Sequence, residues 1–403
     1  MQTGARYQAV LDLITEIFKD KFPADNIIND YLRERKYIGS GDRRFITDTV
    51  WRLIRSRRKF EFDAGSREPR KILLASLKDE DLDLIFGAGA YSPAPLSKEE
   101  KIWLKNFNEE VYPPDVEAEC PAWLFDKVKD PALLKSLNQP ANADLRINVA
   151  DRQEVIRRLR GEGLFFAPTP YSPIGIRSSE RVNLNNCVAY KEGLVDVQDE
   201  ASQLVAILCD AKPGLKIMDY CAGAGGKSLT ISYLLGGQGT VRAHDIDQRR
   251  LEQIKPRLER LNVKNVELCR EVRDRDYDRF IVDAPCSGSG TWRRSPDAKY
   301  RLTPQKLKEI NKTQSELLDT AYEHTKPGGR IVYITCSILR DEDEDIINGF
   351  TRRNRNVRHI DMRNLWQRLL DAPYPGSCDK FLRFSPLTTD TDGFFISVLE
   401  KIR

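Results

Sequence analysis

The chain has 403 residues, and its 65 Lys+Arg against 61 Asp+Glu leave a net charge of only +4. This overall excess is too small to indicate nucleic-acid binding, which only local clustering of charge could do. No apolar run reaches the roughly 18 residues of a membrane span, and the N-terminus lacks the layout of a signal peptide, so we expect neither. The length predicts two or three domains.

Residues 1–140 are predicted to form a helical domain. Apolar residues recur at helical spacing in Tyr7–Phe18 and again in Ser40–Phe62. The second of these segments is rich in basic residues: Arg43, Arg44, Arg52, Arg55, Arg57, Arg58 and Lys59. They form either a solvated helix face or a face that contacts RNA phosphates, and the density of arginine favours the second interpretation.

Residues 141–204 are predicted to form a small α+β module that binds RNA. A strand is expected at 145–149, a helix at 151–163 that ends at glycine, and a strand leading into a helix at 194–208. The pattern changes again at about residue 205, where a third domain is predicted to begin and to continue to residue 403.

Strands and helices alternate in this third domain. Strands are predicted at 215–220, 239–246, 266–269, 278–284, 329–337 and 393–401, with helices at 248–262 and 304–326. Such alternation is typical of an α/β fold with a doubly wound, mostly parallel sheet. Ligands of these sheets bind beyond the carboxyl ends of the strands.

A glycine-rich turn, Asp219–Ser228, follows the first of these strands and opens a helix. Its small residues allow a ligand to approach the backbone closely. A phosphate-binding P-loop is disfavoured, because Cys221 stands where that motif needs glycine. Asp245 ends the next strand, about 20 residues on, where an acid accepts hydrogen bonds from a ribose, whereas Asp247 fits a helix cap better. The site thus predicts either NAD or S-adenosylmethionine.

The chain has eight cysteines and three histidines, and no two cysteines form a CxxC pair. A zinc cage or thioredoxin motif is therefore not expected, and we predict no metal. Most of the cysteines fit buried thiols of a cytoplasmic protein. They are Cys120, Cys187, Cys209, Cys221, Cys269, Cys286, Cys336 and Cys378.

Two of these cysteines follow predicted strands. Cys286 lies in DAPCSGSG (Asp283–Gly290) and Cys336 in VYITCSIL (Val332–Leu339). In a parallel sheet both would face one crevice. Two such thiols without a CxxC motif predict one nucleophile and one helper.

With these motifs the C-terminal half resembles the Sun/Nop family of RNA (cytosine-C5) methyltransferases, in particular its bacterial ribosomal-RNA members. The resemblance extends from Val197 to the end through VQDEASQL, DYCAGAGGK, DID, DAPCSGSGTWRRSPDAK, TCSIL and TDGFF, and more loosely to GDRRFITDTVWRLI near the N-terminus. It implies a class I methyltransferase (Rossmann-like) fold with a seven-stranded sheet, S-adenosyl-L-methionine as cofactor, and RNA, in particular ribosomal RNA, as partner. We expect a monomer.

The resemblance also implies residue roles. Cys336 would be the nucleophile, Cys286 would assist its release, and Asp283 would bind the base. The turn reads CAGAGGK where the family usually has CAAPGGK, and Glu271 aligns with a family aspartate that touches adenosine. The implied cofactor-binding residues are Cys221, Ala222, Gly223, Ala224, Gly225, Gly226, Lys227, Asp245, Glu271 and Asp283.

The chemistry of cytosine explains the cysteines independently. C5 is too poor a nucleophile to take a methyl group directly, and a thiolate that adds to C6 activates it. The base must leave any stack to be reached, which predicts single-stranded or opened RNA. The segment after Cys286 carries an aromatic residue and several cations, suited to RNA contact or to a surface loop: Trp292, Arg293, Arg294, Lys299 and Arg301.

Two other function classes fit the sequence less well. A nucleotide-dependent oxidoreductase is disfavoured, because the sequence lacks the GxGxxG motif of that class and because such a function leaves both cysteines unexplained. An RNA-binding assembly factor that has lost turnover conflicts with the intact Cys336, Cys286 and Asp283.

Overall fold

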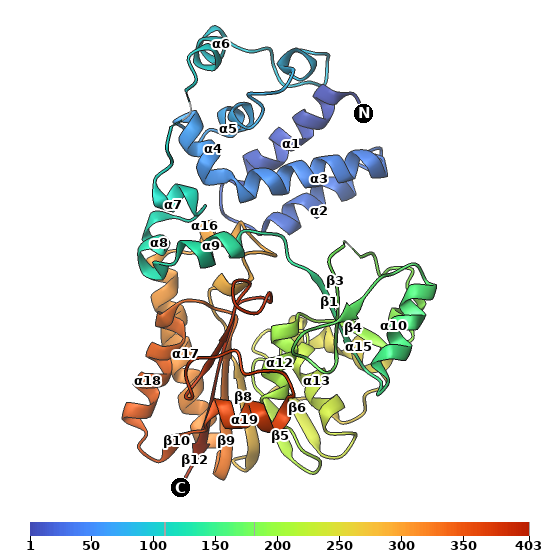
Figure 1. The fold of residues 1–403 in the computed structure, drawn as a ribbon, viewed down its shortest axis with the longest axis vertical. Helices are drawn as coiled ribbons and strands as arrows, with labels where there is room; N and C mark the ends of the chain where they lie inside the picture. Colours follow the sequence, from blue (N-terminus) through green and yellow to red (C-terminus); the bar gives the residue numbers. More distant parts are fainter. Residues whose placement is uncertain (109, 181, 403) are drawn as a thin grey trace. The chain divides into compact units, whose positions relative to one another are not determined.

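The computed structural model describes residues 1–108, 110–180 and 182–402. The chain divides into two compact units. The first comprises Met1–Gln139 together with Trp292–Thr303, and the second comprises Pro140–Thr291 together with Pro304–Arg403. The first unit is helical, and the second contains two β-sheets (Figure 1). The division into three domains at residues 140 and 204 stays a prediction.

The first unit is built from amphipathic helices around one apolar core. Its helices are α1 (Thr3–Ile17), α2 (Ala24–Glu34), α3 (Ser40–Arg55), α4 (Arg57–Ala64), α5 (Pro69–Ala75), α6 (Lys98–Lys105), α7 (Pro114–Glu117), α8 (Ala122–Val128) and α9 (Pro131–Leu137). The stripe of α3, with Ile46, Val50 and Leu53, is completely buried, as its helical spacing predicts. The predicted helix at 40–62 is two helices that meet at Ser56.

The segment Trp292–Thr303, which includes the short helix α16 (Ala298–Arg301), belongs to the helical unit. Asp297 accepts a hydrogen bond from the backbone N–H of Ala24 at 3.0 Å. Arg55 donates to the carbonyl of Arg293 at 2.7 Å. The segment that follows the Cys286 loop is therefore held inside the helical unit.

The expectation that Trp292, Arg293 and Lys299 contact RNA is wrong. All three are buried in the helical unit. Lys299 donates to Asn138 Oδ1 at 3.0 Å. Burial lowers the pKa of Lys299 to about 8 and raises that of the nearby Glu119 to about 7. These side chains stabilise the protein's interior rather than stacking on bases.

The expectation for the basic segment is also wrong for Arg57, which is buried, whereas for the partly exposed Arg55 and Arg58 it stays a prediction. Arg57 pairs with Asp20 at 2.8 Å, and its guanidinium lies between the rings of Phe18 and Tyr300. Arg58 pairs with Asp115 at 2.6 Å. Arg55 donates to backbone carbonyls. Their partners lie far away in sequence, so the local pattern could not indicate them.

Two arginines of α3 remain in contact with solvent. Arg44 is 80% exposed and Arg52 is exposed as well. They are the exposed arginines of this helix that could still meet a phosphate backbone.

The smaller sheet of the second unit is antiparallel throughout, with the order β2-β3-β1-β4. Its elements are β1 (Ala143–Ile147), α10 (Arg152–Gly161), β2 (Ala167–Pro168), β3 (Gly175–Ser178), α11 (Val188–Lys191) and β4 (Val195–Val197). This matches the strand and helix pattern expected for 145–163. Binding of RNA by this module stays a prediction.

The larger sheet has the order β10-β12-β9-β8-β5-β6-β7, and β11 pairs beside β12. The five strands from β9 to β7 are parallel, whereas β12 and β10 run antiparallel to their neighbours. The strands are β5 (Lys216–Asp219), β6 (Thr240–Ala243), β7 (Val266–Leu268), β8 (Tyr277–Asp283), β9 (Thr325–Thr335), β10 (Val357–His359), β11 (Leu382–Phe384) and β12 (Phe394–Lys401). The predicted α/β fold with seven strands in line is confirmed, although β10 and β11 were not predicted.

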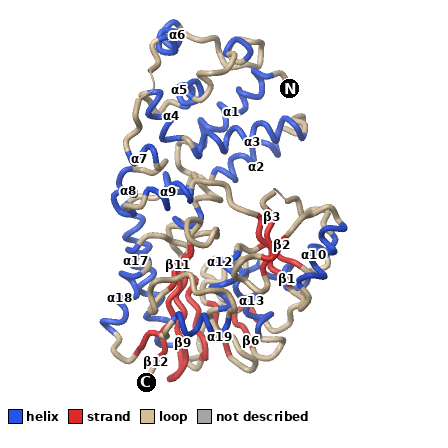
Figure 2. The backbone as a smooth tube through the Cα atoms, viewed as in Figure 1, coloured by secondary structure: helices blue, strands red, loops and turns tan. Residues whose placement is uncertain are grey.

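Both faces of this sheet are covered by helices, which is why its strands are apolar on consecutive residues. Val332 packs into the core on one face, with α12, α13 and α19, and Tyr333 into the core on the other, with α17 and α18 (Figure 2). The helices are α12 (Glu200–Ile207), α13 (Gly226–Leu234), α14 (Gln248–Glu252), α15 (Ile254–Arg260), α17 (Pro304–His324), α18 (Glu344–Arg353) and α19 (Met362–Leu369). The predicted helix at 248–262 is interrupted before Pro256, which cannot donate a backbone hydrogen bond.

Within the described part of the chain, no helix has the length and apolar character needed to cross a membrane. The same residues contain no cluster of three or more His, Cys, Asp or Glu side chains arranged to hold a metal ion.

Candidate active site

The glycine-rich turn connects the end of β5 to the start of α13. Gly225 precedes the helix with φ 81°, and Gly223 has φ 54°, both in the left-handed region. A side chain at Gly225 would also place its Cβ 2.5 Å from Ile254. Glycine is therefore required here by both conformation and space, and the turn leaves the backbone of 221–226 free of bulky side chains.

Asp245 holds this turn from the end of β6. Its Oδ2 accepts from the N–H of Gly223 at 2.8 Å, and its Oδ1 accepts from the N–H of Asp247 at 2.8 Å. A carboxylate has about four acceptor positions, so each oxygen keeps one for a ligand hydroxyl. Asp247 caps α14, as predicted, through the N–H groups of Arg249 and Arg250.

Asp219 lies beneath the turn and is completely buried. It accepts from the hydroxyl of Ser228 at 2.5 Å. Burial raises the pKa of Asp219 to about 7. The carboxyl thus joins the last residue of β5 to the first turn of α13.

The two strand-end cysteines meet. Their strands are parallel neighbours, with Asp283 of β8 beside Ile334 of β9. Cys286 Sγ and Cys336 Sγ lie 3.3 Å apart, and neither cysteine is in a disulfide. The contact with Cys336, together with burial, raises the pKa of Cys286 well above its usual range. The two thiols therefore lie in direct contact at the carboxyl ends of neighbouring parallel strands.

Lys227 and Asp283 form an ion pair next to these cysteines. Lys227 Nζ donates to Asp283 Oδ2 at 2.7 Å and lies 5.0 Å from the ring centre of Phe394. Burial disfavours the ammonium, but the charge of Asp283 and that of Cys336 outweigh it and raise the pKa of Lys227. Lys227 thus carries a positive charge at this end of the sheet.

A buried carboxylate, Glu342, was missed by sequence reasoning. It follows β9 in the run DEDED, whose charge is typical of a solvated surface. Its side chain accepts from the N–H of Ser287 at 2.7 Å and from the hydroxyl of Ser337 at 2.6 Å. Burial raises the pKa of Glu342. Its hydrogen bonds to serines of two different loops could not be predicted from the local sequence.

Two further residues hold the glycine-rich turn and were also missed. Arg257 donates to the carbonyl of Ala224 and to Asp196 of the small sheet. Gln198 accepts from the hydroxyl of Thr230 at 2.8 Å. Only Gln198 had a signal, since it lies within the quoted motif VQDEASQL.

The remaining predicted cofactor residues differ in their surroundings. Cys221 is half-buried within the turn. Glu271 lies beyond β7 with its carboxylate exposed and paired with Arg273 at 2.6 Å. Among the described residues, no hydrogen bond joins Glu271 to the turn, and its contact with a cofactor stays a prediction.

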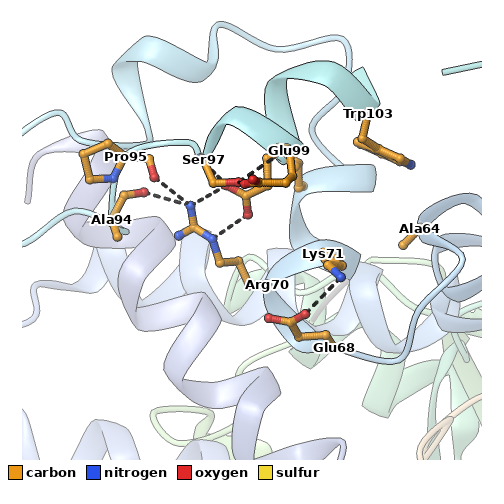
Figure 3. A pocket seen from close by; sticks show the side chains of 11 residues that line it. Ala64, Glu68, Arg70, Lys71, Ala94, Pro95, Ser97, Glu99 and Trp103 are labelled. Carbon is orange, nitrogen blue, oxygen red and sulfur yellow. Dashed lines mark hydrogen bonds and ion pairs between the residues drawn. The ribbon is translucent and has the colours of Figure 1, made fainter. Parts of the chain in front are cut away.

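The helical unit has a separate cavity of about 590 Å³. Figure 3 shows that Arg70 on its wall contacts the carbonyls of Ala94 and Pro95, while Lys71 pairs with Glu68. Arg70 also donates to Glu100 at 2.7 Å. Among the described residues no cysteine lines this cavity, so it does not resemble the cysteine site.

Comparisons with known proteins show which family and which relatives the chain is similar to. Residues 206–400 match the family described as 16S rRNA methyltransferase RsmB/F. The chain is 32% identical over 253 residues to ribosomal RNA small subunit methyltransferase B of Photorhabdus laumondii, covering 59% of each protein. It is 29% identical over 296 residues to the protein of the same name from Vibrio vulnificus, covering 70% of this chain and 66% of the relative. The matched region thus spans less than two thirds of these relatives.

Solved structures share the fold. PH0851 has a TM-score of 0.77 at 24% identity, over 99% of this chain and 98% of that protein. A methyltransferase homologue from Pyrococcus horikoshii has a TM-score of 0.61 at 25% identity, over 72% of this chain and 97% of the other. NSun6 from the same organism, solved with SFG, has a TM-score of 0.64 at 20% identity, over 72% of this chain and 100% of its own.

Proposed function

We propose that this chain is an S-adenosylmethionine-dependent RNA cytosine-C5 methyltransferase that acts on ribosomal RNA, because residues 206–400 match the 16S rRNA methyltransferase RsmB/F family. The names of the relatives support ribosomal RNA as the class of substrate. The adjacent thiols of Cys286 and Cys336 support cytosine as the target base and a mechanism with a covalent intermediate.

The turn at 221–227 and Asp245 fit S-adenosylmethionine, which supplies the methyl group when bound. Asp245 is nearly buried and retains acceptor capacity for ribose hydroxyls. The backbone N–H groups at the start of α13 favour a negatively charged carboxylate. The small residues between them leave the backbone open to close approach.

Cys336 is the nucleophile of the proposed reaction. Its sulfur adds to C6 of the cytosine, which makes C5 electron-rich enough to accept a methyl group. After methylation the C5 proton passes to solvent, the electrons of the C5–H bond re-form the C5=C6 double bond, the bond between sulfur and C6 breaks, and the thiolate returns to Cys336. Cys286 assists the final release.

Lys227 and Asp283 orient the base. Asp283 accepts from the exocyclic amino group of cytosine, while Lys227 holds the carboxylate in place through the 2.7 Å ion pair. The target base must leave its stack to reach Cys336, so the substrate is single-stranded or locally opened RNA.

The observation that carries this proposal is the 3.3 Å contact between the two sulfurs, and the two sulfurs also provide its test. Cys336→Ala should abolish methylation and form no protein–RNA adduct. Cys286→Ala should attack and methylate but stall, bonded to its product through Cys336. The adduct should survive denaturing electrophoresis, disappear on nuclease treatment and be absent from the double variant.

The reverse pattern, with an adduct only in Cys336→Ala, would show that the roles are exchanged. Methylation that persists in Cys336→Ala without any adduct would overturn the covalent mechanism. Bisulfite sequencing of total RNA from cells with and without the gene would identify the modified cytosine, and no difference in any RNA would contradict the proposed activity.

A further inference from the structure

Cys286 has no regular secondary structure to position it. β8 ends at Asp283, and the next element, a single turn, begins at Ser289. Cys336 follows β9 directly, and Thr335 beside it is paired with Phe395 of β12. The position of Cys286 relative to Cys336 must therefore come from contacts outside the strands.

Glu342 and Gln314 supply several of these contacts, and the backbone N–H of Gly290 also donates to the carbonyl of Cys336 at 2.9 Å. The side chains of Glu342 and Gln314 are completely buried, and Gln314 donates to Glu342 Oε1 at 3.2 Å. Gln314 also donates to the carbonyl of Pro285 at 3.0 Å, immediately before Cys286. Glu342 accepts from the N–H and from the hydroxyl of Ser287, immediately after it. The backbone of Cys286 is held on both sides by one buried pair.

Glu342 also reaches the loop of the other cysteine. Its Oε2 accepts from the hydroxyl of Ser337, the residue that follows Cys336. The phenol of Tyr333 on β9 donates to its backbone carbonyl at 2.6 Å. A single carboxylate thus contacts the residue after each cysteine, with donors on both oxygens.

A buried carboxylate is costly unless it is fully hydrogen-bonded, and burial raises the pKa of Glu342 despite its four donors. An apolar side chain would avoid that cost but would leave the four donors without an acceptor. The retention of a charged acceptor fits a requirement for defined geometry between the loops rather than for stability alone.

We propose that Glu342, assisted by Gln314, is a positioning residue that sets Cys286 against Cys336 for the release step. The proposal rests on the proposed function above. It separates the two covalent steps, because Cys336 directly follows β9, whereas Cys286 lies in a loop that the Glu342–Gln314 pair holds on both sides. Loss of the pair should leave attack intact and slow release.

The experiment compares the trapped protein–RNA adduct in Glu342→Ala, Glu342→Gln and Gln314→Ala, with Cys286→Ala as the positive control. Misplacement of a reacting group by about 1 Å costs on the order of 100-fold in rate. We expect Glu342→Ala and Gln314→Ala to accumulate adduct while turnover falls by about 10- to 100-fold. Glu342→Gln keeps the volume and one acceptor, and should lie between them and the wild type.

Glu200→Ala is the matched control. Glu200 is also completely buried and accepts from two backbone N–H groups, those of Tyr171 and Ser172, but it contacts neither cysteine loop through these bonds. It should lower the unfolding temperature without trapping RNA.

A second readout needs no RNA. Diamide, which oxidises two thiols to a disulfide while it is itself reduced, should link Cys286 to Cys336 rapidly in the wild type and more slowly in the Glu342 variants. Peptide mapping identifies the linked pair. If Cys286→Ala traps RNA but Glu342→Ala behaves like Glu200→Ala in both assays, the positioning role is wrong. If Cys286→Ala itself traps nothing, the covalent function has failed instead.

Discussion

Lys227 Nζ lies 2.7 Å from Asp283 Oδ2, so the first turn of α13 is tied by an ion pair to the last residue of β8. One of these elements carries the glycine-rich turn and the other leads to Cys286. The pair therefore joins the predicted cofactor site to the predicted base site through two side chains.

Replacing Lys227 by Met should leave the carboxylate of Asp283 without its cation. We expect methylation to fall by about 100-fold or more, because a fixed charge beside the reacting groups is removed. Lys216→Met is the control: Lys216 begins β5, pairs with Asp276 at 2.5 Å and is partly exposed. Equal reductions in both variants would mean that the ion pair has no special part in the reaction.

Asp245→Ala should weaken binding of S-adenosylmethionine. The change removes a charge-assisted contact worth about 1.5–3 kcal/mol, which corresponds to about a 10- to 150-fold rise in Kd. Calorimetry measures this directly. Asp247→Ala removes the neighbouring helix cap and should cost stability but little affinity. Unchanged affinity in Asp245→Ala would remove this residue from the cofactor site.

Asp219→Asn should change how stability depends on pH. The folded-state pKa of about 7 lies above the value near 4 of an unfolded aspartate, so the folded protein binds the extra proton between these limits. The contribution of Asp219 to the free energy of unfolding is therefore present below about pH 4 and is lost as pH rises to 7, by at most about 4 kcal/mol.

Denaturant unfolding of the wild type and of Asp219→Asn between pH 4 and 8 measures the difference. The amide cannot ionise, so the variant should gain stability relative to the wild type as pH rises. A difference that is constant across this range would show that Asp219 does not titrate there.

Reversing Arg44 and Arg52 to Glu should weaken RNA binding and flatten its salt dependence. Each phosphate that the protein no longer neutralises lowers the slope by about 0.7 for single-stranded RNA. Arg352→Glu, on the exposed side of α18, is the control. An unaltered slope would mean that α3 has only a solvated face.

The meeting of Cys286 and Cys336 could be predicted from the sequence, because both follow apolar strands whose carboxyl ends share one edge of a parallel sheet. Asp245 could be predicted for the same reason. Glu342 could not, since acidic runs usually lie on surfaces and its donors come from two other loops.

The burial of Arg57 and Lys299 could not be predicted from the sequence either. Arg57 is stacked between the rings of Phe18 and Tyr300, and Lys299 is hydrogen-bonded to Asn138. A dense basic stretch looks the same in sequence whether its partners are phosphates or carboxylates from distant segments. Only the tertiary structure distinguishes the two.

The return of Trp292–Thr303 to the helical unit has a consequence for biosynthesis. A chain emerging from the ribosome presents Met1–Gln139 long before it presents the segment whose Asp297 binds the N–H of Ala24 and whose Arg293 carbonyl binds Arg55. The first unit is therefore not complete when residue 139 has been translated, and its last buried contacts wait until most of the second unit has been synthesised.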